Sequence, residues 1–214
     1  MYLVLVLTET WLSKRESSSV YFPDKFKVYR YDRIVPNSNR RYGGVAILVH
    51  QQLNHQRLTV KENSDEVECV AVEIKMKPIS LVIYAVYMRV FDPVVAAKHV
   101  INIKELCKTF DTHRIMVLGD FNMSSVKWKM DESEEYYLPT NVDTSMENFL
   151  VEMQDVPFFQ LSNVKNKFHN VLDLVFVNDL GDVELSVDQS KIVGSVQQDV
   201  SHVPYEIAFE YCTR

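Results

Sequence analysis

Glycine is scarce in this chain, which has only 5 glycines and 7 prolines in 214 residues. Low-complexity linkers would need more of both, so the composition favours one compact domain spanning residues 1–214. Hydrophobic residues make up 47% of the chain and charged residues 24%, which is close to the globular average. These values argue against an intrinsically disordered protein.

Long apolar runs and paired cysteines are also missing. No segment approaches the roughly 20 apolar residues that span a bilayer, and Met1–Leu7 lacks the basic leader and cleavage site of a signal peptide. The cysteines Cys69, Cys107 and Cys212 lie far apart and form no CxxC pair. We therefore expect an intracellular protein with reduced thiols, without a membrane partner, a disulfide frame or a zinc site.

An excess of positive charge is absent as well, since the formal net charge is -6 at pH 7. A protein that coats DNA without sequence preference is usually basic. An acidic chain still binds DNA where its basic residues cluster, although each cluster is also compatible with ordinary solvated charges. The candidate clusters are Lys14-Arg15, Arg30 with Arg33, Arg40-Arg41, Lys127 with Lys129, and Lys165 with Lys167.

What the chain does contain is a series of short runs rich in Val, Ile, Tyr and Phe, which predict strands. Several runs, for example Leu3–Leu7 and Val117–Leu118, are apolar on both faces and belong inside a layered structure. There are too many strands for one flat sheet in a chain of this size, so we expect an α/β fold of two packed sheets with flanking helices. The predicted strands are Tyr2–Thr8, Lys27–Tyr31, Val45–Val49, Val67–Lys75, Leu81–Tyr87, Arg114–Gly119, Phe158–Ser162, Leu172–Val177, Val183–Val187 and Tyr205–Phe209.

Two segments have helical periodicity. The first helix begins at Pro93 and carries an apolar stripe that ends at Phe110. The second is Thr144–Met153, with Asp143 or Thr144 as its N-cap and an apolar face formed by Met146, Phe149, Leu150 and Met153. The polar segment Met123–Asn141 is predicted to be a surface loop.

Polar side chains stand at four strand ends, which makes them candidates for chemistry. Glu9 follows the first apolar run, Asp120 and Asn122 follow a middle one, Asp173 interrupts another, and His202 precedes the last. Residues two apart in a strand share a face, so a carboxylate and an amide at positions 120 and 122 can hold a metal ion and a phosphate oxygen side by side. If the four ends meet, they form a metal ligand set and a histidine–carboxylate pair.

Such a set suits phosphodiester cleavage, which must activate water and stabilise charge on the phosphoryl oxygens. A divalent ion on Glu9, close to Asp120, would neutralise that charge; Mg²⁺ fits an all-oxygen site, with Mn²⁺ as the alternative. His202 would donate a hydrogen bond to the phosphate or take a proton from the attacking water, and Asp173 would fix its tautomer.

Each candidate also has a simpler interpretation. Glu9 fits a solvated charge at a strand end, Asp120 and Asn122 fit an Asx turn, and His202 fits a structural histidine. Asp173 is harder to explain in this way, because a carboxylate inside an apolar strand is costly unless it is paired. The five other histidines carry no supporting pattern and are expected to be surface or helix residues.

Five motifs appear together in an order that resembles the endonuclease domain of non-LTR retrotransposons, within the AP-endonuclease-like endonuclease/exonuclease/phosphatase superfamily. The resemblance covers residues from about Leu3 to Glu210 and implies a four-layer α/β sandwich of two mixed β-sheets. It also implies a Mg²⁺-dependent nick in DNA that leaves a 3′-hydroxyl for reverse transcription, a nuclear location, and a reverse transcriptase domain in a longer product. The motifs are Thr8-Glu9-Thr10-Trp11-Leu12-Ser13, Gly43-Gly44-Val45-Ala46-Ile47, Leu118-Gly119-Asp120-Phe121-Asn122, Leu172-Asp173-Leu174-Val175-Phe176-Val177-Asn178 and Ser201-His202-Val203-Pro204.

The resemblance assigns a role to each matched residue. Glu9 would be a metal ligand, and Asp120 would position or activate the water. Asn122 would hold the water or the phosphate, and Asp173 would orient His202. Tyr87, which ends Ile83-Tyr84-Ala85-Val86-Tyr87, would hydrogen-bond the phosphate; its simpler interpretation is a strand-end aromatic residue packed on the sheet.

Three departures from the family pattern bear on activity. The strand that usually precedes the one ending at Glu9 is missing, Ser201 replaces an acidic residue, and Met88-Arg89-Val90 replaces a proline-containing turn. Asp199 stands two residues before Ser201 and is a candidate substitute as a metal ligand. We therefore expect an N-terminally truncated copy of the domain, with weakened activity.

Two other functions stay open at this point. One is a catalytically inactive remnant that acts as a nucleic-acid-binding or interaction module. The other is a phosphatase or phospholipase within the same superfamily, against which the retroelement-style segments Glu9–Leu12 and Asn163–Lys165 argue. Candidate DNA-reading loops are those around Arg40-Arg41, Met123–Asn141 and Ser190–Val200.

Overall fold

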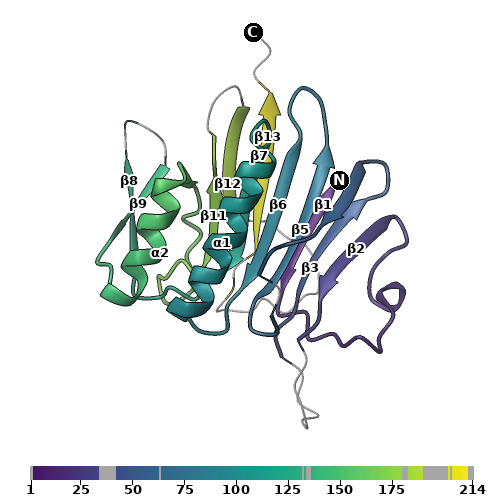
Figure 1. Ribbon diagram of the computed structural model, residues 1–214, viewed down its shortest axis with the longest axis horizontal. Coiled ribbons are helices and arrows are strands. Elements are labelled where there is room, and N and C mark those ends of the chain that lie inside the picture. The colour runs from purple at the N-terminus through teal and green to yellow at the C-terminus, as the bar shows by residue number, and fades with distance from the viewer. Residues whose placement is uncertain are drawn as a thin grey trace.

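The computed structural model of the chain describes residues 2–33, 42–62, 64–131, 133, 136–179, 183–189, 202 and 204–211. They form a large sheet, a small sheet, a C-terminal hairpin and two α-helices (Figure 1). The helices are α1 (Pro93–Thr109) and α2 (Thr144–Asp155). The strands are β1 (Val4–Thr8), β2 (Phe26–Tyr31), β3 (Val45–His50), β4 (Asn54–Leu58), β5 (Glu68–Lys75), β6 (Leu81–Tyr87), β7 (Arg114–Asp120), β8 (Lys127–Asp131), β9 (Tyr136–Thr140), β10 (Phe159–Gln160), β11 (Asp173–Val177), β12 (Val183–Gln189) and β13 (Tyr205–Tyr211).

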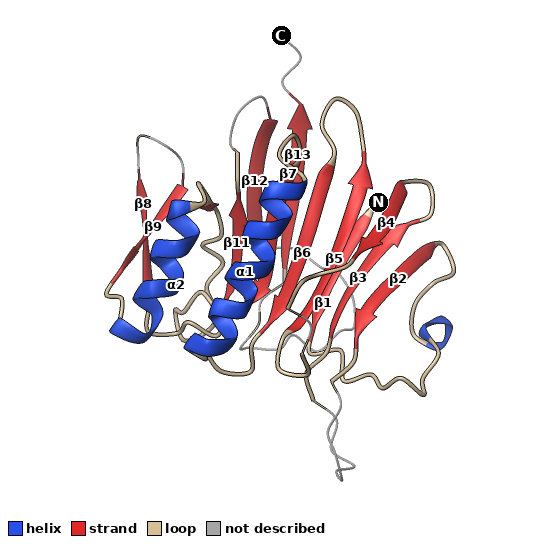
Figure 2. Cartoon of the chain, viewed as in Figure 1, coloured by secondary structure: helices blue, strands red, loops and turns tan. Residues whose placement is uncertain are grey.

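The large sheet has eight strands in the order β4-β5-β6-β7-β11-β10-β9-β8, and the small sheet has three in the order β1-β3-β2. Strands β6 and β7 run parallel, with α1 as their crossover, whereas the other neighbours in the large sheet are antiparallel. Both α-helices cover one face of the large sheet (Figure 2). The predicted α/β sandwich of two sheets with flanking helices is therefore confirmed.

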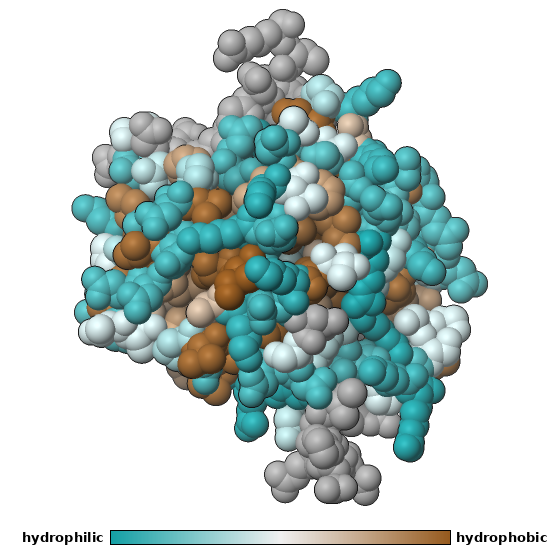
Figure 3. Space-filling model, viewed as in Figure 1, coloured by the Kyte–Doolittle hydropathy of each residue, from teal (hydrophilic) through white to brown (hydrophobic). Residues whose placement is uncertain are grey.

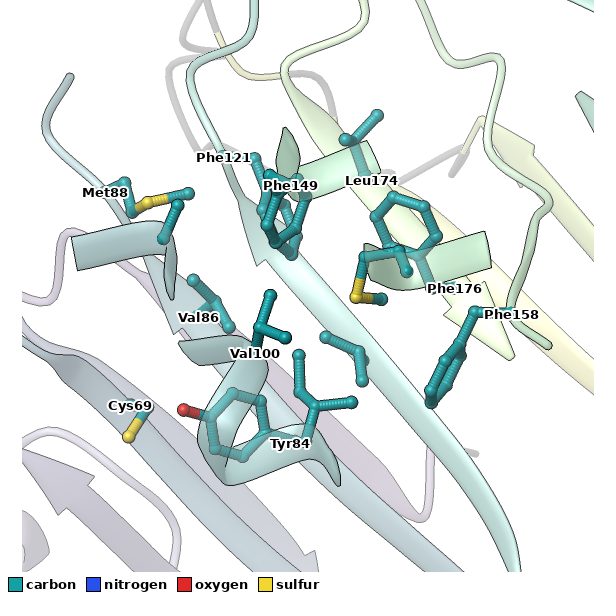
Figure 4. Packing of buried hydrophobic residues seen from close by; sticks show 14 of the residues in the cluster. Cys69, Tyr84, Val86, Met88, Val100, Phe121, Phe149, Phe158, Leu174 and Phe176 are labelled. Carbon is teal, nitrogen blue, oxygen red and sulfur yellow. The ribbon is translucent and has the colours of Figure 1, made fainter. Parts of the chain in front are cut away.

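The central strands of the large sheet, β5, β6, β7 and β11, are buried on both faces because most of their residues are apolar. Along β6, Tyr84 and Val86 pack toward the helices, whereas Ile83 and Ala85 pack toward the small sheet. On the helix side, the rings of Phe121, Phe149 and Phe176 lie 5.7 to 6.3 Å apart and join α2 to β7 and β11 (Figure 4). Continuous apolar runs thus mark the central layer, as the sequence predicts.

Both helices begin where their capping residues predict. Asp92 accepts hydrogen bonds from the backbone of Val94 and Val95, which fixes the start of α1 at Pro93. Asp143 does the same for α2, so Asp143 and not Thr144 is its N-cap. The apolar face predicted for α2, formed by Met146, Phe149, Leu150 and Met153, is buried.

The prediction of a surface loop at Met123–Asn141 is wrong, because this segment holds β8 and β9. The two strands pair antiparallel, with Trp128 opposite Pro139 and Met130 opposite Tyr137. The Trp128 ring lies 6.3 Å from that of Phe176, so packing at the edge of the large sheet stabilises a segment whose composition favours a loop. Strand β4 was also not predicted, and β10 is shorter than expected.

Strand β1 is less buried than its sequence predicts. Its five residues are all partly exposed, and Leu3 just before it is 38% exposed. Among the described residues β3 is its hydrogen-bonded neighbour, so β1 lies at an edge of the small sheet. Interior packing on both faces was therefore the wrong expectation for Leu3–Leu7, although it holds for Val117–Leu118.

The surface on the helix-bearing side mixes polar side chains with several hydrophobic patches (Figure 3). No helix in the described ranges combines the length and the apolar character that a bilayer crossing requires. The described cysteines, Cys69 and Cys107, are free thiols.

A buried histidine lies on the face of α1 that packs against the large sheet. His99 is fully buried, and its Nδ1 lies 2.9 Å from the Tyr84 hydroxyl, which accepts a hydrogen bond from Asn102. His99 Nε2 has no hydrogen-bond partner among the described residues. Burial lowers the pKa of this imidazole from 6.5 to about 3, so the folded protein holds it neutral.

Acid should therefore destabilise the fold through His99. Between its unfolded and folded pKa values only the unfolded chain binds the proton, so the free energy of unfolding falls as pH drops from 6.5 toward 3. By about pH 5 this histidine costs about 2 kcal/mol. Urea melts at pH 7 and pH 5 should show a smaller loss for His99→Gln than for the parent protein. Equal losses in both proteins would contradict the assignment.

Candidate active site

A row of polar side chains crosses four adjacent strands of the large sheet. The strand register places Glu68 of β5 opposite Tyr87 of β6, Tyr87 opposite Asp120 of β7, and Asp120 opposite Asp173 of β11. Residues directly opposite each other point to the same face of a sheet. This is the face toward the small sheet, because Leu118 and Val175, two residues along their strands, pack in the core between the sheets. We call these four residues the polar row.

The end of β7 is shaped to present Asp120. Gly119 has φ of 137°, and a Cβ there would lie 2.0 Å from the Val86 carbonyl oxygen, so only glycine allows β6 and β7 to approach this closely. Asn122 follows in the left-handed region with φ of 52°. Its backbone N–H donates to Asp120 Oδ1 at 2.9 Å, and its Nδ2 donates to Asp120 Oδ2 at 3.0 Å and to the Met88 carbonyl at 2.7 Å.

Asp120 and Asn122 thus form an Asx turn, which was the simpler of the two interpretations of their sequence. Asn122 also fixes both oxygens of the Asp120 carboxylate. Its amide hydrogens are directed at Asp120 and Met88 and not outward. In this structure Asn122 positions Asp120, whereas its predicted contact with water or phosphate stays a prediction.

Glu9 reaches the polar row from the small sheet. It follows β1 with φ of 51°, and the next two residues are fixed by hydrogen bonds from Thr10 N to Gly44 O at 3.3 Å and from Trp11 N to Gly43 O at 3.0 Å. The Tyr87 hydroxyl donates to Glu9 Oε1. Tyr87 therefore links the two sheets at the site, and its hydroxyl faces a carboxylate.

His202, just before β13, lies between two carboxylates. Its Nδ1 is 3.0 Å from Asp173 Oδ2, and its Nε2 is 3.6 Å from Asp120 Oδ2. A proton on Nδ1 donated to Asp173 directs Nε2 toward Asp120. The structure thus brings together five residues singled out in the sequence, namely Glu9, Tyr87, Asp120, Asp173 and His202, with Asn122 beside them. Asp199 lies outside the described residues.

Burial and neighbouring carboxylates change the pKa of two residues in the candidate active site, Asp120 and Tyr87. The Asp120 side chain is buried, and desolvation, followed by the charge of Asp173, raises its pKa to about 8. The His202 charge opposes this increase, and the Glu9 charge adds to it. Burial, followed by the hydrogen bond to Glu9, raises the pKa of Tyr87, so its hydroxyl stays a donor. Crowded, buried carboxylates favour the arrival of a cation.

The donor set fits a divalent cation. One ligand atom from each of Asp120, Asp173 and His202 lies within 4.8 Å of the others. The charge of Glu9 reaches Asp120, which adds a further carboxylate near this group. Hard ions such as Mg²⁺ prefer oxygen donors, and these carboxylates supply them. This grouping consists of three residues that were predicted to be catalytic, and the predicted metal ligand Glu9 is not part of it. The other predicted ligand, Asp199, lies outside the described residues.

Glu68 was missed in the sequence. It is fully buried, forms an ion pair with Arg33 through Oε1, and accepts a hydrogen bond from Gly44 N at 2.6 Å through Oε2. A Cβ on Gly43, whose φ is 78°, would lie 2.6 Å from this carboxylate, so the glycine leaves room for it. A signal was available, because Glu68 opens the mostly apolar strand β5 as Asp173 opens β11.

Searches by sequence found nothing, since no protein-family model and no curated protein matches the chain. Solved structures do match. The endonuclease domain of TRAS1, a telomere-specific non-LTR retrotransposon, is 14% identical with a TM-score of 0.55, covering 87% of this chain and 81% of its own. An endonuclease/exonuclease/phosphatase family protein from Leptotrichia buccalis is 14% identical with a TM-score of 0.56, covering 98% and 88%.

A third structure, the 3′ phosphatase NExo from Neisseria bound to a product DNA hairpin, is 13% identical with a TM-score of 0.55, covering 98% of this chain and 89% of its own. At this level of identity the likeness concerns the fold. The chain has the endonuclease/exonuclease/phosphatase fold, as its motifs predict.

Proposed function

We propose that this chain is a divalent-metal-dependent phosphodiesterase that nicks DNA and leaves a 3′-hydroxyl, the end from which a reverse transcriptase extends. The observation that carries the proposal is the polar row with His202 beside Asp120 and Asp173. The fold neighbours support it, since they include a retrotransposon endonuclease domain and a DNA 3′ phosphatase.

The carboxylates Glu9, Asp120 and Asp173 would hold the divalent ion, which supplies Lewis-acid stabilisation of charge on the phosphoryl oxygens. Tyr87 would turn its hydroxyl from Glu9 to a phosphate oxygen. Each of these residues comes from a strand or a strand end, so the sheets fix their positions before the substrate arrives.

His202, oriented by Asp173, would carry out the proton transfer. The hydrogen bond at 3.0 Å holds Nδ1 protonated, so Nε2 is the atom that takes a proton from water or donates one to the phosphate. Asn122 would keep Asp120 oriented through its two hydrogen bonds. Water bound by Asp120 would then attack phosphorus on the side opposite the leaving 3′-oxygen, and a proton would restore that oxygen as a hydroxyl.

The test is nicking of supercoiled plasmid by the purified chain, with Mg²⁺ or with a chelator. We expect Mg²⁺-dependent conversion to open circle, lost in chelator and reduced about 10²- to 10⁴-fold in His202→Asn. His169→Asn is the matched control, since His169 is exposed and has φ of 61°, a conformation that asparagine tolerates. DNA polymerase should extend the nicks directly if they end in a 3′-hydroxyl.

Absence of nicking by the folded parent protein would overturn hydrolysis and favour the non-catalytic binding module. Nicks that a polymerase extends only after treatment with a 3′-phosphatase would instead overturn the assignment of the 3′-hydroxyl end and leave the nuclease assignment in place.

A further inference from the structure

Two arginines and a tyrosine gather beside the candidate active site. The guanidinium carbon of Arg33 lies 5.6 Å from the centroid of the Tyr42 ring, and that of Arg89 lies 5.2 Å from it. Arg33 also lies 6.0 Å from the Tyr87 ring. Cations over aromatic faces are attracted to them, so Tyr42 holds both side chains close to the polar row.

The backbone just before Arg89 is tied to the Asp120–Asn122 turn. Met88, the residue before it, donates its N–H to the Asp120 carbonyl at 2.8 Å and accepts from Asn122 Nδ2 at 2.7 Å. Any movement of this backbone would disturb the Asp120 turn. The arginine is therefore placed one residue away from the group that would position the attacking water.

The two arginines differ in what balances their charge. Arg33 forms an ion pair with the buried Glu68. Arg89 is exposed, and its contact is the Tyr42 ring; no described carboxylate pairs with it. An arginine held in place without an acidic partner is suited to an oxyanion such as a phosphate.

Trp11 is joined to this group of residues through its backbone. It is 53% exposed, has φ of 54°, and is held by its backbone hydrogen bond to Gly43, next to Tyr42. A bulky residue in the left-handed region is strained, and such strain persists where the surrounding structure enforces it. The backbone thus presents an indole to solvent two residues after Glu9.

The charge of the chain favours an arginine such as Arg89 at a site that binds a nucleic acid. The chain carries a net charge of -6, and the site itself is lined by carboxylates that repel phosphates. A positive group at the rim offsets this repulsion, and an exposed aromatic face binds a base by stacking. Stacking on indole requires a base whose face is open, so the ligand is a nucleotide that is not stacked in a duplex.

We propose that Arg89 and Trp11 bind one unstacked nucleotide of the DNA beside the scissile bond, with the guanidinium on its phosphate and the indole on its base. Tyr42 holds Arg89 in place. This inference rests on the proposed function for its choice of DNA as the substrate, and it adds a preference for single-stranded or locally opened DNA.

The test measures binding separately from cleavage. Because the chain has two tryptophans, Trp128→Phe leaves Trp11 as the sole indole fluorophore. In a His202→Asn, Trp128→Phe background, a short single-stranded oligonucleotide should quench the Trp11 emission. The anisotropy of a labelled oligonucleotide should give affinities at several salt concentrations, for single-stranded DNA and for the same sequence in a duplex.

We expect tighter binding to the single strand than to the duplex. Arg89→Ala should weaken binding about tenfold and reduce the salt dependence by about one phosphate contact, whereas Arg89→Lys should keep the salt dependence. Trp11→Ala should weaken binding at least about fivefold without changing the salt dependence, and Trp11→Phe should restore most of the affinity. The control is Lys25→Ala, an exposed cation 5.5 Å from the Phe26 ring at the far end of β2.

The outcomes separate the two proposals. Unchanged binding in both Arg89→Ala and Trp11→Ala would overturn the nucleotide site, even if the parent protein nicks plasmid. Equal losses for Lys25→Ala would also overturn it. Oligonucleotide binding that depends on both residues, in a protein that nicks no plasmid, would support the nucleotide site and overturn hydrolysis.

Discussion

Asp173→Asn should reduce the rate of DNA nicking about 10³- to 10⁴-fold while leaving the protein at least as stable as the parent. Asp173 accepts a hydrogen bond from His202 Nδ1 at 3.0 Å. An asparagine amide can instead donate to Nδ1, which moves the histidine proton to Nε2 and removes the base from the side facing Asp120. A change of tautomer of this kind reduces the rate of serine proteases by about 10⁴.

The stability of Asp173→Asn should not fall with its nicking rate and should equal or exceed that of the parent protein. The Asp173 charge raises the pKa of the buried Asp120, so removing it relieves a repulsion between two carboxylates. Single-turnover nicking and thermal melting of the same samples check both statements, and ¹⁵N NMR of His202 reports the tautomer. A rate loss accompanied by a lower melting temperature would show that Asp173 acts through folding and not through the histidine.

The second prediction with a large expected effect concerns the contribution of Arg33 to the stability of the fold. Arg33→Met should lower the free energy of unfolding by about 3–5 kcal/mol, because it leaves a buried carboxylate without its cation. Glu68 is fully buried, and the arginine is its charged partner. Burial raises the pKa of Glu68 above its value in the unfolded chain, an effect that the Gly44 N–H and Arg33 oppose. The stability cost should therefore be small at acidic pH and increase as pH rises through the folded-state pKa.

A double substitution provides the control. Glu68→Gln removes the charge but keeps an acceptor for Gly44 N–H, so Arg33→Met combined with Glu68→Gln should regain most of the stability lost in Arg33→Met. Denaturant melts of the four proteins form a double-mutant cycle. Additive losses would show that the ion pair contributes little and that Arg33 stabilises the fold in another way.

Much of this architecture could be predicted because the central strands are continuous apolar runs bounded by polar residues. Asp173 was identifiable from one fact, a carboxylate inside an apolar strand. Glu68 also opens its strand, but β5 carries two further charged residues, Glu73 and Lys75, so Glu68 is easily taken for a solvated charge. Its place in the polar row depends on the register between β5 and β6, and no local pattern encodes a register.

The expectations for β8, β9 and β1 were wrong for a related reason, since these strands depend on contacts that no local sequence pattern encodes. Strands β8 and β9 contain proline, lysine and aspartate, and contact with residues distant in sequence stabilises them, such as the packing of Trp128 on Phe176. Strand β1 has the composition of an interior strand, yet burial depends on its neighbours and not on its own residues. The arginines around Tyr42 come from separate parts of the chain, so their meeting follows from the fold alone.

The polar row also means that the large sheet itself sets the distances between residues of the candidate active site. Neighbouring strands lie about 4.8 Å apart, so backbone hydrogen bonding sets the spacing of Glu68, Tyr87, Asp120 and Asp173 without help from loops. A slip of one residue in any of these strands would turn its polar group toward the helices. If the chain is the nuclease proposed above, changes in the loops at the rim would alter which DNA it binds, while backbone hydrogen bonding in the sheet would keep the distances between the site residues fixed.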